Sequence, residues 1–307
     1  MRGIRRQPKA MLTAAASVAL LTAAVPAAAT AAAAKATPIC TSAKHPYIAA
    51  KISAGISAAL AGRPGSFVGL DAVDGADGLS CQLHATDHFY AASVVKVTIL
   101  SALLLKVGGP SHLTAAQRSL AVQMITQSSN SAAQTLWEEE GISAVQNFLN
   151  KAGMGETELN TAWGLTRITA HDELRQLQVL TDSTVISSAS RGYVLTLMSE
   201  VIASERWGVS EDASASVTVH IKNGWLPYPG AADWNINSIG AFTGKNIVYQ
   251  MAILTAPPGS GGQAESYGIE TIEAAAAAFN KDLATWSRWH AARRAVPDVD
   301  VAHAPGG

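Results

Sequence analysis

The chain has 307 residues, of which 48% are hydrophobic and 15% charged, and its formal net charge at pH 7 is −1. A chain of this length and composition can bury a sizeable core in one large or two small domains, which excludes disorder as its main state. With 22 basic and 23 acidic residues and no lysine- or arginine-rich block, the chain lacks the clustered positive charge that binds nucleic-acid phosphates. A small molecule or another polymer is therefore the expected partner.

The N-terminal segment, residues 1–34, differs from the rest in composition. Four basic residues at positions 2–9 precede an apolar stretch, Met11–Val25, and small residues follow. This is the pattern of a secretory signal peptide. The apolar stretch is about 15 residues long, shorter than the roughly 20 needed to span a membrane. With cleavage after Ala29 or Ala34, we expect a secreted, extracellular protein without a stable membrane anchor.

Cys40 and Cys81 are the only cysteines, and both lie beyond the signal peptide. An exported protein folds under oxidising conditions, in which cysteines pair. We therefore expect one disulfide between them.

The periodicity of the apolar residues predicts helices where they recur every three to four positions and strands where they alternate. Glycine- and proline-rich segments separate these elements and mark turns. In chain order, the sequence predicts a helix at 46–60, strands at 67–73 and 79–85, helices at 94–107, 114–125, 131–139, 142–152, 169–180 and 188–203, strands at 217–221, 234–240 and 247–255, and a helix at about 265–289.

This order of elements predicts the fold class α+β. Strands from both ends of the chain, at about 40–90 and 212–290, would form one sheet subdomain of about five strands, with helices before and after the strands. The segment at about 91–211 would be an all-helical insertion, and a cleft should form where the two subdomains meet. The tail at 293–307 is rich in Pro, Ala, Asp and Gly, and we expect it to be unstructured.

Three short motifs carry candidate chemistry. Ser93 and Lys96 form the only Ser-x-x-Lys in the chain, at the start of the buried helix, where the lysine could take the proton of the serine. Ser128 and Asn130 follow an apolar stretch, and Lys222-Asn223-Gly224 closes the first of the late strands. Each motif alone fits a helix cap or a turn. Their occurrence together, in this order, favours a site that acylates a serine.

Together these motifs resemble those of the class A β-lactamases and the related penicillin-recognising D,D-peptidases, over about residues 46–283. The resemblance implies an α+β fold with an antiparallel sheet flanked by the terminal helices, within a domain at 35–292. It also implies that Ser93 is the acylated nucleophile and Lys96 its base or base partner. Ser128 would then pass the proton to the leaving nitrogen.

The same resemblance implies the residues that bind the substrate. Asn130 would bind the substrate amide, and Lys222 would add positive potential. The backbone N–H groups of Ser93 and Trp225 would form the oxyanion hole. Where the family usually has threonine or serine in the motif of Lys222 and Gly224, this chain has Asn223, which leaves the substrate preference open.

Removal of the acyl group requires a base that activates water. The segment Glu156–Asn160 resembles the family's Glu-x-x-Leu-Asn loop, so that Glu156 would be this base and Asn160 would help to hold the water. Two alternatives stay open. Glu156 and Glu158 fit solvated loop acids equally well, and the segment Trp163–Arg167 could replace the family loop.

The resemblance predicts a secreted serine hydrolase of the class A β-lactamase type, which opens β-lactam amides through an acyl-Ser93 intermediate and would give antibiotic resistance. One alternative is a penicillin-binding, D,D-peptidase-like hydrolase that acts on peptidoglycan-derived amides and deacylates slowly. Another is a non-catalytic binding protein on the same fold. No metal or organic cofactor is implied, and we expect a monomer.

Overall fold

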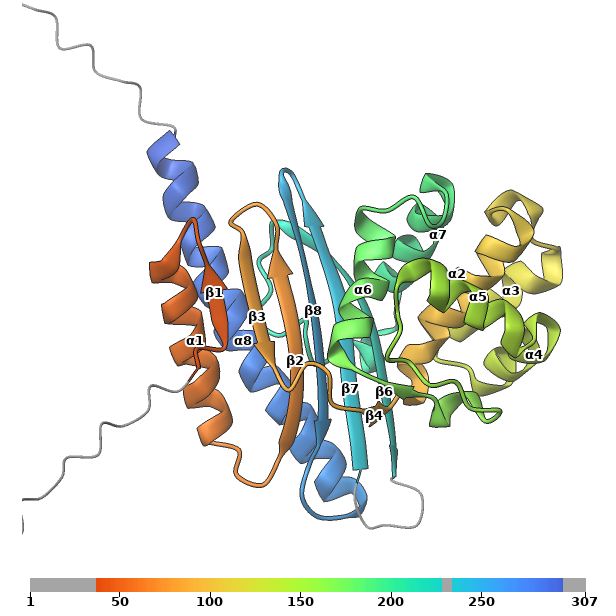
Figure 1. Ribbon diagram of the computed structural model, residues 1–307, viewed down its shortest axis with the longest axis horizontal. Helices are drawn as coiled ribbons and strands as arrows, with labels where there is room; N and C mark the ends of the chain where they lie inside the picture. Colours follow the sequence, from red (N-terminus) through yellow and green to blue (C-terminus); the bar gives the residue numbers. More distant parts are fainter. Residues whose placement is uncertain (1–36, 228–233, 295–307) are drawn as a thin grey trace, which may run out of the picture. The chain divides into compact units, whose positions relative to one another are not determined.

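The computed structural model describes residues 37–227 and 234–294. The predicted signal peptide at 1–34 lies outside the described residues. Of the tail predicted to be unstructured at 293–307, residues 293 and 294 are the end of helix α8, and the rest also lies outside the described residues. The helices are α1 (Pro46–Ala61), α2 (Val95–Val107), α3 (Ala115–Thr126), α4 (Asn130–Glu140), α5 (Ile142–Ala152), α6 (Ala170–Thr181), α7 (Ser188–Ser199) and α8 (Gly261–Arg294), with short 3₁₀ turns η1 (Ala92–Val94), η2 (Pro110–His112), η3 (Trp163–Leu165) and η4 (Ala203–Glu205) (Figure 1).

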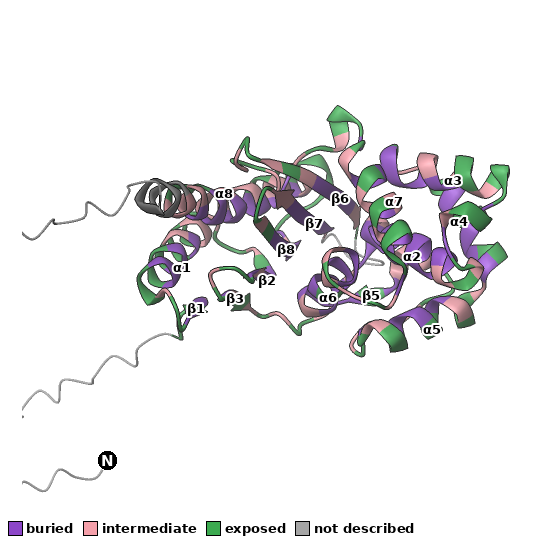
Figure 2. Cartoon of the chain, turned by 90° about the horizontal axis from the view of Figure 1, so that it is seen from above, coloured by how far each residue is buried: buried purple, intermediate pink, exposed green. Residues whose placement is uncertain are grey.

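The main sheet has six antiparallel strands in the order β1-β3-β2-β8-β7-β6. Helices α1 and α8 pack on one face of this sheet, and α6, with the other helices of the central segment, covers the opposite side (Figures 1 and 2). The strands are β1 (Cys40–Ser42), β2 (Phe67–Asp74), β3 (Leu79–Leu83), β6 (Val217–Pro227), β7 (Trp234–Gly244) and β8 (Ile247–Ala256), and a separate pair is formed by β4 (Phe89–Tyr90) and β5 (Arg167–Ile168).

Strand β8 shows how the sheet separates two hydrophobic cores. Met251 and Ile253 pack in the core that α1 and α8 cover, whereas Ala252 and Leu254 pack in the core of the helical part. Successive side chains of a strand point to opposite faces, so both faces of the sheet are buried here. The disulfide between Cys40 and Cys81 joins β1 to β3 beside the first of these cores.

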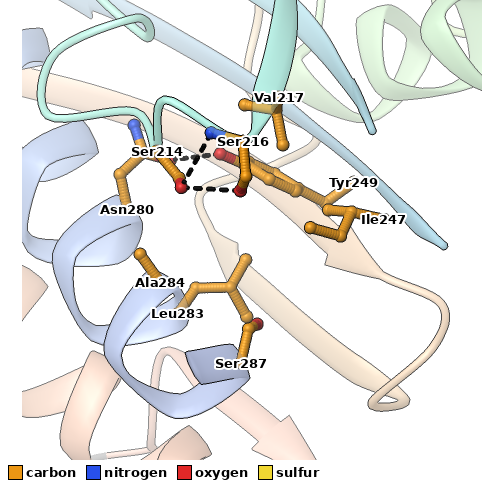
Figure 3. Close-up of a pocket in the computed structure, with 9 residues that line it drawn as sticks. All are labelled: Ser214, Ser216, Val217, Ile247, Tyr249, Asn280, Leu283, Ala284 and Ser287. Atoms are coloured by element: carbon orange, nitrogen blue, oxygen red, sulfur yellow. Dashed lines mark hydrogen bonds between the residues drawn. The ribbon is translucent and has the colours of Figure 1, made fainter. Parts of the chain in front are cut away.

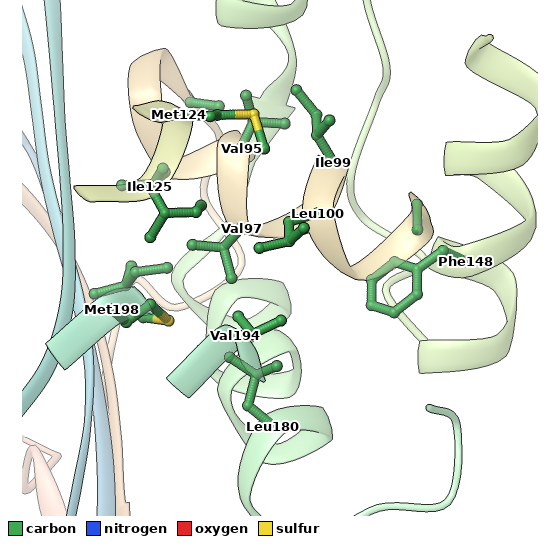
Figure 4. Close-up of a cluster of buried hydrophobic side chains, with 14 of the residues drawn as sticks. Val95, Val97, Ile99, Leu100, Met124, Ile125, Phe148, Leu180, Val194 and Met198 are labelled. Atoms are coloured by element: carbon green, nitrogen blue, oxygen red, sulfur yellow. The ribbon is translucent and has the colours of Figure 1, made fainter. Parts of the chain in front are cut away.

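Helix α2 runs through the middle of the helical part. All of its residues from Val95 to Leu104 are buried, which is the pattern of a helix surrounded on every side. Figure 4 shows Val97 and Leu100 of this helix among side chains from its neighbours, including Phe148 and Val194 (Figure 4). Such close packing fixes the position and rotation of α2, and with it the residues at its N-terminal end.

The outer helices of this part are amphipathic, and α5 buries Val145, Phe148 and Leu149 while most of its other residues are exposed or half-buried (Figure 2). Among the described residues, every helix is too short or too polar to span a lipid bilayer.

The α+β fold with an antiparallel sheet is confirmed, and the sheet has six strands where the sequence predicted about five. The additional strand β1 and the pair β4 and β5 are two or three residues long, too short for a periodicity to show.

One prediction was wrong in a way that matters for the site. Strand β6 continues to Pro227, so Lys222-Asn223-Gly224 lies inside the strand rather than closing it, because β6 pairs with β7 along its whole length.

Candidate active site

The N-terminal end of α2 lies against the middle of β6. Ser93 sits in η1, where α2 begins, and is half-buried. An ideal Cβ on Gly224 would lie 2.6 Å from the nitrogen of Ser93 and 2.8 Å from the nitrogen of Val94. No side chain fits there, so the glycine allows the backbone of β6 to approach the backbone of the candidate nucleophile.

Lys96 lies one helical turn after Ser93, and its side chain is fully buried. Its Nζ donates to Ser93 Oγ at 2.8 Å, to the backbone oxygen of Ser128 at 2.6 Å and to Asn130 Oδ1 at 2.7 Å. The hydroxyl of Ser128 is 3.3 Å from the same nitrogen. The first two sequence motifs therefore meet at this ammonium group.

The third motif joins them through Ser128. Lys222 Nζ donates to Ser128 Oγ at 2.9 Å and to the backbone oxygen of Asn223 at 2.8 Å, and its side chain is fully buried. Hydrogen bonds thus connect Ser93 Oγ to Lys96, to Ser128 and to Lys222. This connection is a path along which a proton could move.

The backbone is unusual at two points of the site. Ala92, next to the candidate nucleophile, and Ser128 both have positive φ angles, of 49° and 55°. Residues other than glycine rarely adopt this region, and such conformations gather at functional sites. Ser128 lies in the short connection from α3 to α4, where the side chain of Ser129 accepts a hydrogen bond from the backbone of Ala132 and caps α4. These constraints hold the Ser128 hydroxyl between the two lysines.

The pKa values of both lysines lie well below the usual value for a lysine side chain. Burial and, secondly, the nearby charge of Lys222 lower the pKa of Lys96 to about 7. Burial lowers the pKa of Lys222 to about 8. The carboxylate of Glu205 acts in the opposite direction on both groups. A substantial fraction of Lys96 is therefore neutral near pH 7, which a general base requires.

The acceptors around Lys96 also suit a neutral amine. The backbone oxygen of Ser128 and Asn130 Oδ1 can only accept hydrogen bonds, so they would take the two N–H groups of the amine. The lone pair can then face Ser93 Oγ, which at 2.8 Å is the nearer of the two hydroxyl groups beside this nitrogen. This is the arrangement in which an amine can remove the hydroxyl proton of the serine.

Asn223, which was expected to contact the substrate, is fully buried and faces elsewhere. Its Nδ2 donates to the backbone oxygens of Glu205 at 2.8 Å and Trp207 at 2.9 Å. Its side chain therefore holds the end of η4 and the residues that follow it against β6. Trp225, two residues later, is half-buried and packs edge-on against Trp207, with ring centroids 5.9 Å apart.

Glu156 and Asn160 make their side-chain contacts with other groups. Glu156 Oε2 accepts from Thr169 Oγ1 at 2.8 Å, and its backbone N–H donates to Asp172 Oδ2 at 2.9 Å. Asn160 Oδ1 accepts from the backbone of Ala162 at 2.9 Å. Within the described residues, neither side chain is hydrogen-bonded to Ser93 or Lys96.

The segment Trp163–Arg167 lies beside the lysine instead. The ring of Trp163 is centred 5.0 Å from Lys96 Nζ, and its Nε1 donates to Gln134 Oε1 at 3.0 Å. The backbone oxygen of Thr166 accepts from the backbone of Ala91 at 2.8 Å, just before the candidate nucleophile. The segment therefore lies against both Lys96 and Ala91, the residue that precedes η1.

Glu205 is the main site residue that the sequence reasoning missed. It ends the 3₁₀ turn η4, and one of its carboxylate oxygens, Oε2, is buried without a hydrogen-bond partner among the described residues. Its charge favours protonation of both Lys96 and Lys222. No local sequence pattern marks it, because its place depends on the contact between η4 and Asn223.

A pocket lies apart from the residues that connect Ser93 to Lys222. It encloses about 260 Å³ between α8 and the ends of β6 and β8, and its lining is mostly apolar, with Tyr249 and Leu283 among its side chains (Figure 3). Tyr249 Oη donates to Asn280 Oδ1 at 3.1 Å. The pocket contains none of the residues that connect Ser93 to Lys222, so the candidate chemistry lies elsewhere.

Comparisons with known proteins identify a family and a shared fold. The model of the family described as "Beta-lactamase enzyme family" matches residues 109–282. No curated protein matches the sequence significantly. Among solved structures, similarity is found to a class A β-lactamase from Bacteroides cellulosilyticus DSM 14838 (16% identity, TM-score 0.65, 76% of this chain and 98% of that chain) and to the protein PBP-A (17% identity, TM-score 0.64, 76% and 96%).

A β-lactamase from Sphaerobacter thermophilus DSM 20745 is also similar, with 20% identity and a TM-score of 0.62 over 76% of this chain and 97% of that chain. A variant of PBP-A has been solved as an acyl-enzyme complex with penicillin G. At these identities the likeness shows a shared fold.

Proposed function

Since the chain belongs to the β-lactamase enzyme family, we propose that it is a serine hydrolase that β-lactams, or related amides, acylate at Ser93. The observation that carries this proposal is the hydrogen-bonded connection from Ser93 Oγ through Lys96 and Ser128 to Lys222. A binding protein would not need two buried lysines in contact with two serines, since burial of each charge is unfavourable. The composition of residues 1–34 supports export.

The acylation step follows from the contacts at Lys96. Neutral Lys96 accepts the proton of the Ser93 hydroxyl while Oγ attacks the carbonyl carbon of the amide. The negative charge that develops on the carbonyl oxygen lies near the backbone N–H groups of Ser93 and Trp225, since Gly224 brings these two segments together.

The leaving nitrogen must then gain a proton. Lys96 passes its proton to Ser128 Oγ, and Ser128 gives its own to the nitrogen as the C–N bond breaks. The Lys222 ammonium, 2.9 Å from Ser128 Oγ, stabilises negative charge on this oxygen during the transfer. The product is an ester of Ser93 with the acyl part of the substrate.

Asn130 can orient the substrate while this happens. Its Oδ1 is occupied by Lys96 at 2.7 Å, which fixes the amide so that Nδ2 is the end left for a ligand. Nδ2 can donate to a carbonyl oxygen of the substrate next to the bond that breaks. Lys222 adds positive potential for an anionic substrate group while it is protonated.

Hydrolysis of the ester needs a second base, and the position of Glu156 does not favour fast release. The Glu156 carboxylate is bound by Thr169, and Trp163 lies next to Lys96. We therefore propose that the acyl-enzyme is long-lived with β-lactams, as in a penicillin-binding hydrolase, rather than turned over as in an efficient β-lactamase.

The rate of Ser93 acylation is expected to show a bell-shaped dependence on pH. The rate should rise as pH increases through about 7, because Lys96 loses its proton and becomes a base. It should fall through about 8, because Lys222 loses its positive charge. Because the charge of Lys222 acts on Lys96, the two apparent pKa values of this profile belong to the pair of lysines and not to either one alone.

Initial rates of labelling with a fluorescent penicillin, measured from about pH 5 to about pH 10, test this expectation. Ser93→Ala serves as the unlabelled control at every pH. A rate that stays constant over this pH range would contradict the role of Lys96 as the base. Label that persists in Ser93→Ala would contradict the role of Ser93 as the nucleophile.

A further inference from the structure

A pocket of about 570 Å³ lies where the C-terminal end of α6 meets the main sheet. Its floor belongs to β2 and β8, and its rim includes residues of the β2–β3 turn and the β7–β8 turn. Both turns lie at the same end of the sheet (Figure 1). The volume is within the range of sites that bind small molecules.

This pocket is separate from the candidate active site. Gly224 of β6 lies against the backbone of Ser93. Across the sheet, Gly224 pairs with Asn237 of β7, which pairs with Leu254 of β8. The pocket instead contains Gln250 of β8, four positions before Leu254, which is roughly 13 Å along a strand. A ligand in this pocket would therefore leave the surroundings of Ser93 free.

Gln250 offers a hydrogen-bond acceptor to such a ligand. The residue is only 6% exposed and lines the pocket. Its Nε2 donates to Thr181 Oγ1 at 2.8 Å, and this hydroxyl donates to the backbone oxygen of Leu177 at 3.0 Å. A hydroxyl has one proton to donate, so these contacts fix which end of the amide faces Thr181. Oε1 has no hydrogen-bond partner among the described residues and is left for an N–H or O–H group of a ligand.

The other polar groups of the lining are mostly uncharged. The side-chain amides of Gln178 and Asn246 make no hydrogen bond within the part of the chain that the structure describes. An amide both donates and accepts, which suits hydroxyl and amide groups of a ligand. Of the described lining residues only Asp182 is charged, and it is exposed. No cation of this lining could pair with an anionic ligand.

A small apolar patch lies beside Gln250. Val73 of β2 is paired directly with Gln250, and Val248 is two positions before it on β8, on the same face of the sheet. Val248 is 42% exposed and Val73 is half-buried. The pocket thus combines an acceptor, free amides and room for one or two methyl groups.

We propose that this pocket is a second binding site, whose ligand is an uncharged sugar that carries an N-acetyl group. Gln250 Oε1 accepts from the N–H of the acetamido group, and the acetyl methyl group packs on Val73 and Val248. The Gln178 amide binds sugar hydroxyls. An amine in place of the acetamido group would lose hydration next to the valines, and its attraction to the exposed Asp182 carboxylate is weak in water.

Titration with N,N′-diacetylchitobiose tests this assignment, with binding followed through the backbone amide NMR shifts of the isotope-labelled protein. Two disaccharides serve as matched probes. Cellobiose has hydroxyl groups in place of the acetamido groups, and the corresponding glucosamine disaccharide has amines. We expect saturable shifts around the pocket with diacetylchitobiose, and binding of either other sugar that is weaker by about tenfold or more.

Two variants remove the groups that carry the proposal. Gln250→Leu keeps the side-chain volume but removes Oε1, and it should weaken binding by about tenfold. Because this change also removes the contact with Thr181, Gln178→Ala is the second variant. The Gln178 amide is not used by the fold, and its loss should weaken binding by about fivefold. The control is Gln146→Leu, at an exposed position of α5 outside the pocket, which should bind as the intact chain does.

The assignment is overturned if diacetylchitobiose gives no saturable shifts at the pocket, or binds equally well to both pocket variants and the control. Tighter binding of the glucosamine disaccharide would also overturn it, because the site would then select an amine. The inference does not depend on the proposed function. Ser93 acylation should proceed at the same rate in all three variants, and a failure of acylation would leave the sugar site standing.

Discussion

Replacing Lys96 with methionine is expected to lower the rate of Ser93 acylation by about a thousandfold. Methionine has a similar length and fills the same buried space, but it can neither accept the Ser93 proton nor pass it to Ser128. Removal of a buried amine also removes an unfavourable desolvation, so this variant should fold. Its loss of activity would then reflect the missing base rather than a missing structure.

The matched control is Lys106→Met, the same substitution near the other end of α2. Lys106 is exposed, and its Nζ donates to the backbone oxygens of Glu139 and Glu140 at the end of α4. Its charge also acts on the Glu140 carboxyl group. Acylation is measured with a labelled penicillin, and thermal unfolding is followed for both variants. If Lys96→Met retained a rate within about tenfold of the intact chain, Lys96 would not be the base.

Gly224→Ala is expected to lower acylation by about a hundredfold or more while the fold is retained. The new methyl group would lie 2.6 Å from the Ser93 nitrogen, 2.8 Å from the Val94 nitrogen and 3.1 Å from the Ala91 oxygen. These are backbone atoms, so either β6 or the start of α2 must move. Either movement displaces Ser93 from the groups that stabilise the transition state.

Gly192→Ala controls for the general effect of adding a methyl group. Gly192 lies in α7, and a Cβ there would meet nothing within 4 Å, so this variant should acylate at the original rate. Circular dichroism and the rate of labelling are compared for the two alanine variants. Equal rates in both would mean that the close approach of β6 to Ser93 is not required for the reaction.

The sequence predicted the parts of the site that depend on local spacing. Ser93 and Lys96 are separated by three positions on one helix, and that spacing alone places both side chains on the same face. Ser128 lies in the short connection after α3, and Asn130 is the first residue of α4. The meeting of these motifs with Lys222 followed from the family resemblance, since no spacing rule brings β6 to α2.

The remaining features depend on contacts between distant segments. The Asn223 side chain donates to the backbone oxygens of Glu205 and Trp207, which lie 18 and 16 positions earlier in the chain. Glu156 is held by Thr169 and Trp163 lies against Lys96, and both contacts depend on how one loop folds back on the helices. A loop of this kind has no periodicity from which its course can be read.

The central claim is that Ser93 is the residue that becomes acylated, and a time course of intact mass tests it most directly. The protein and its Ser93→Ala variant are each mixed with excess benzylpenicillin, and the mass of the protein is followed after the free drug is removed. We expect one adduct per chain on the Ser93 peptide that persists after removal, and no adduct in the variant. Absence of any adduct, or an equal adduct in Ser93→Ala, would contradict the account.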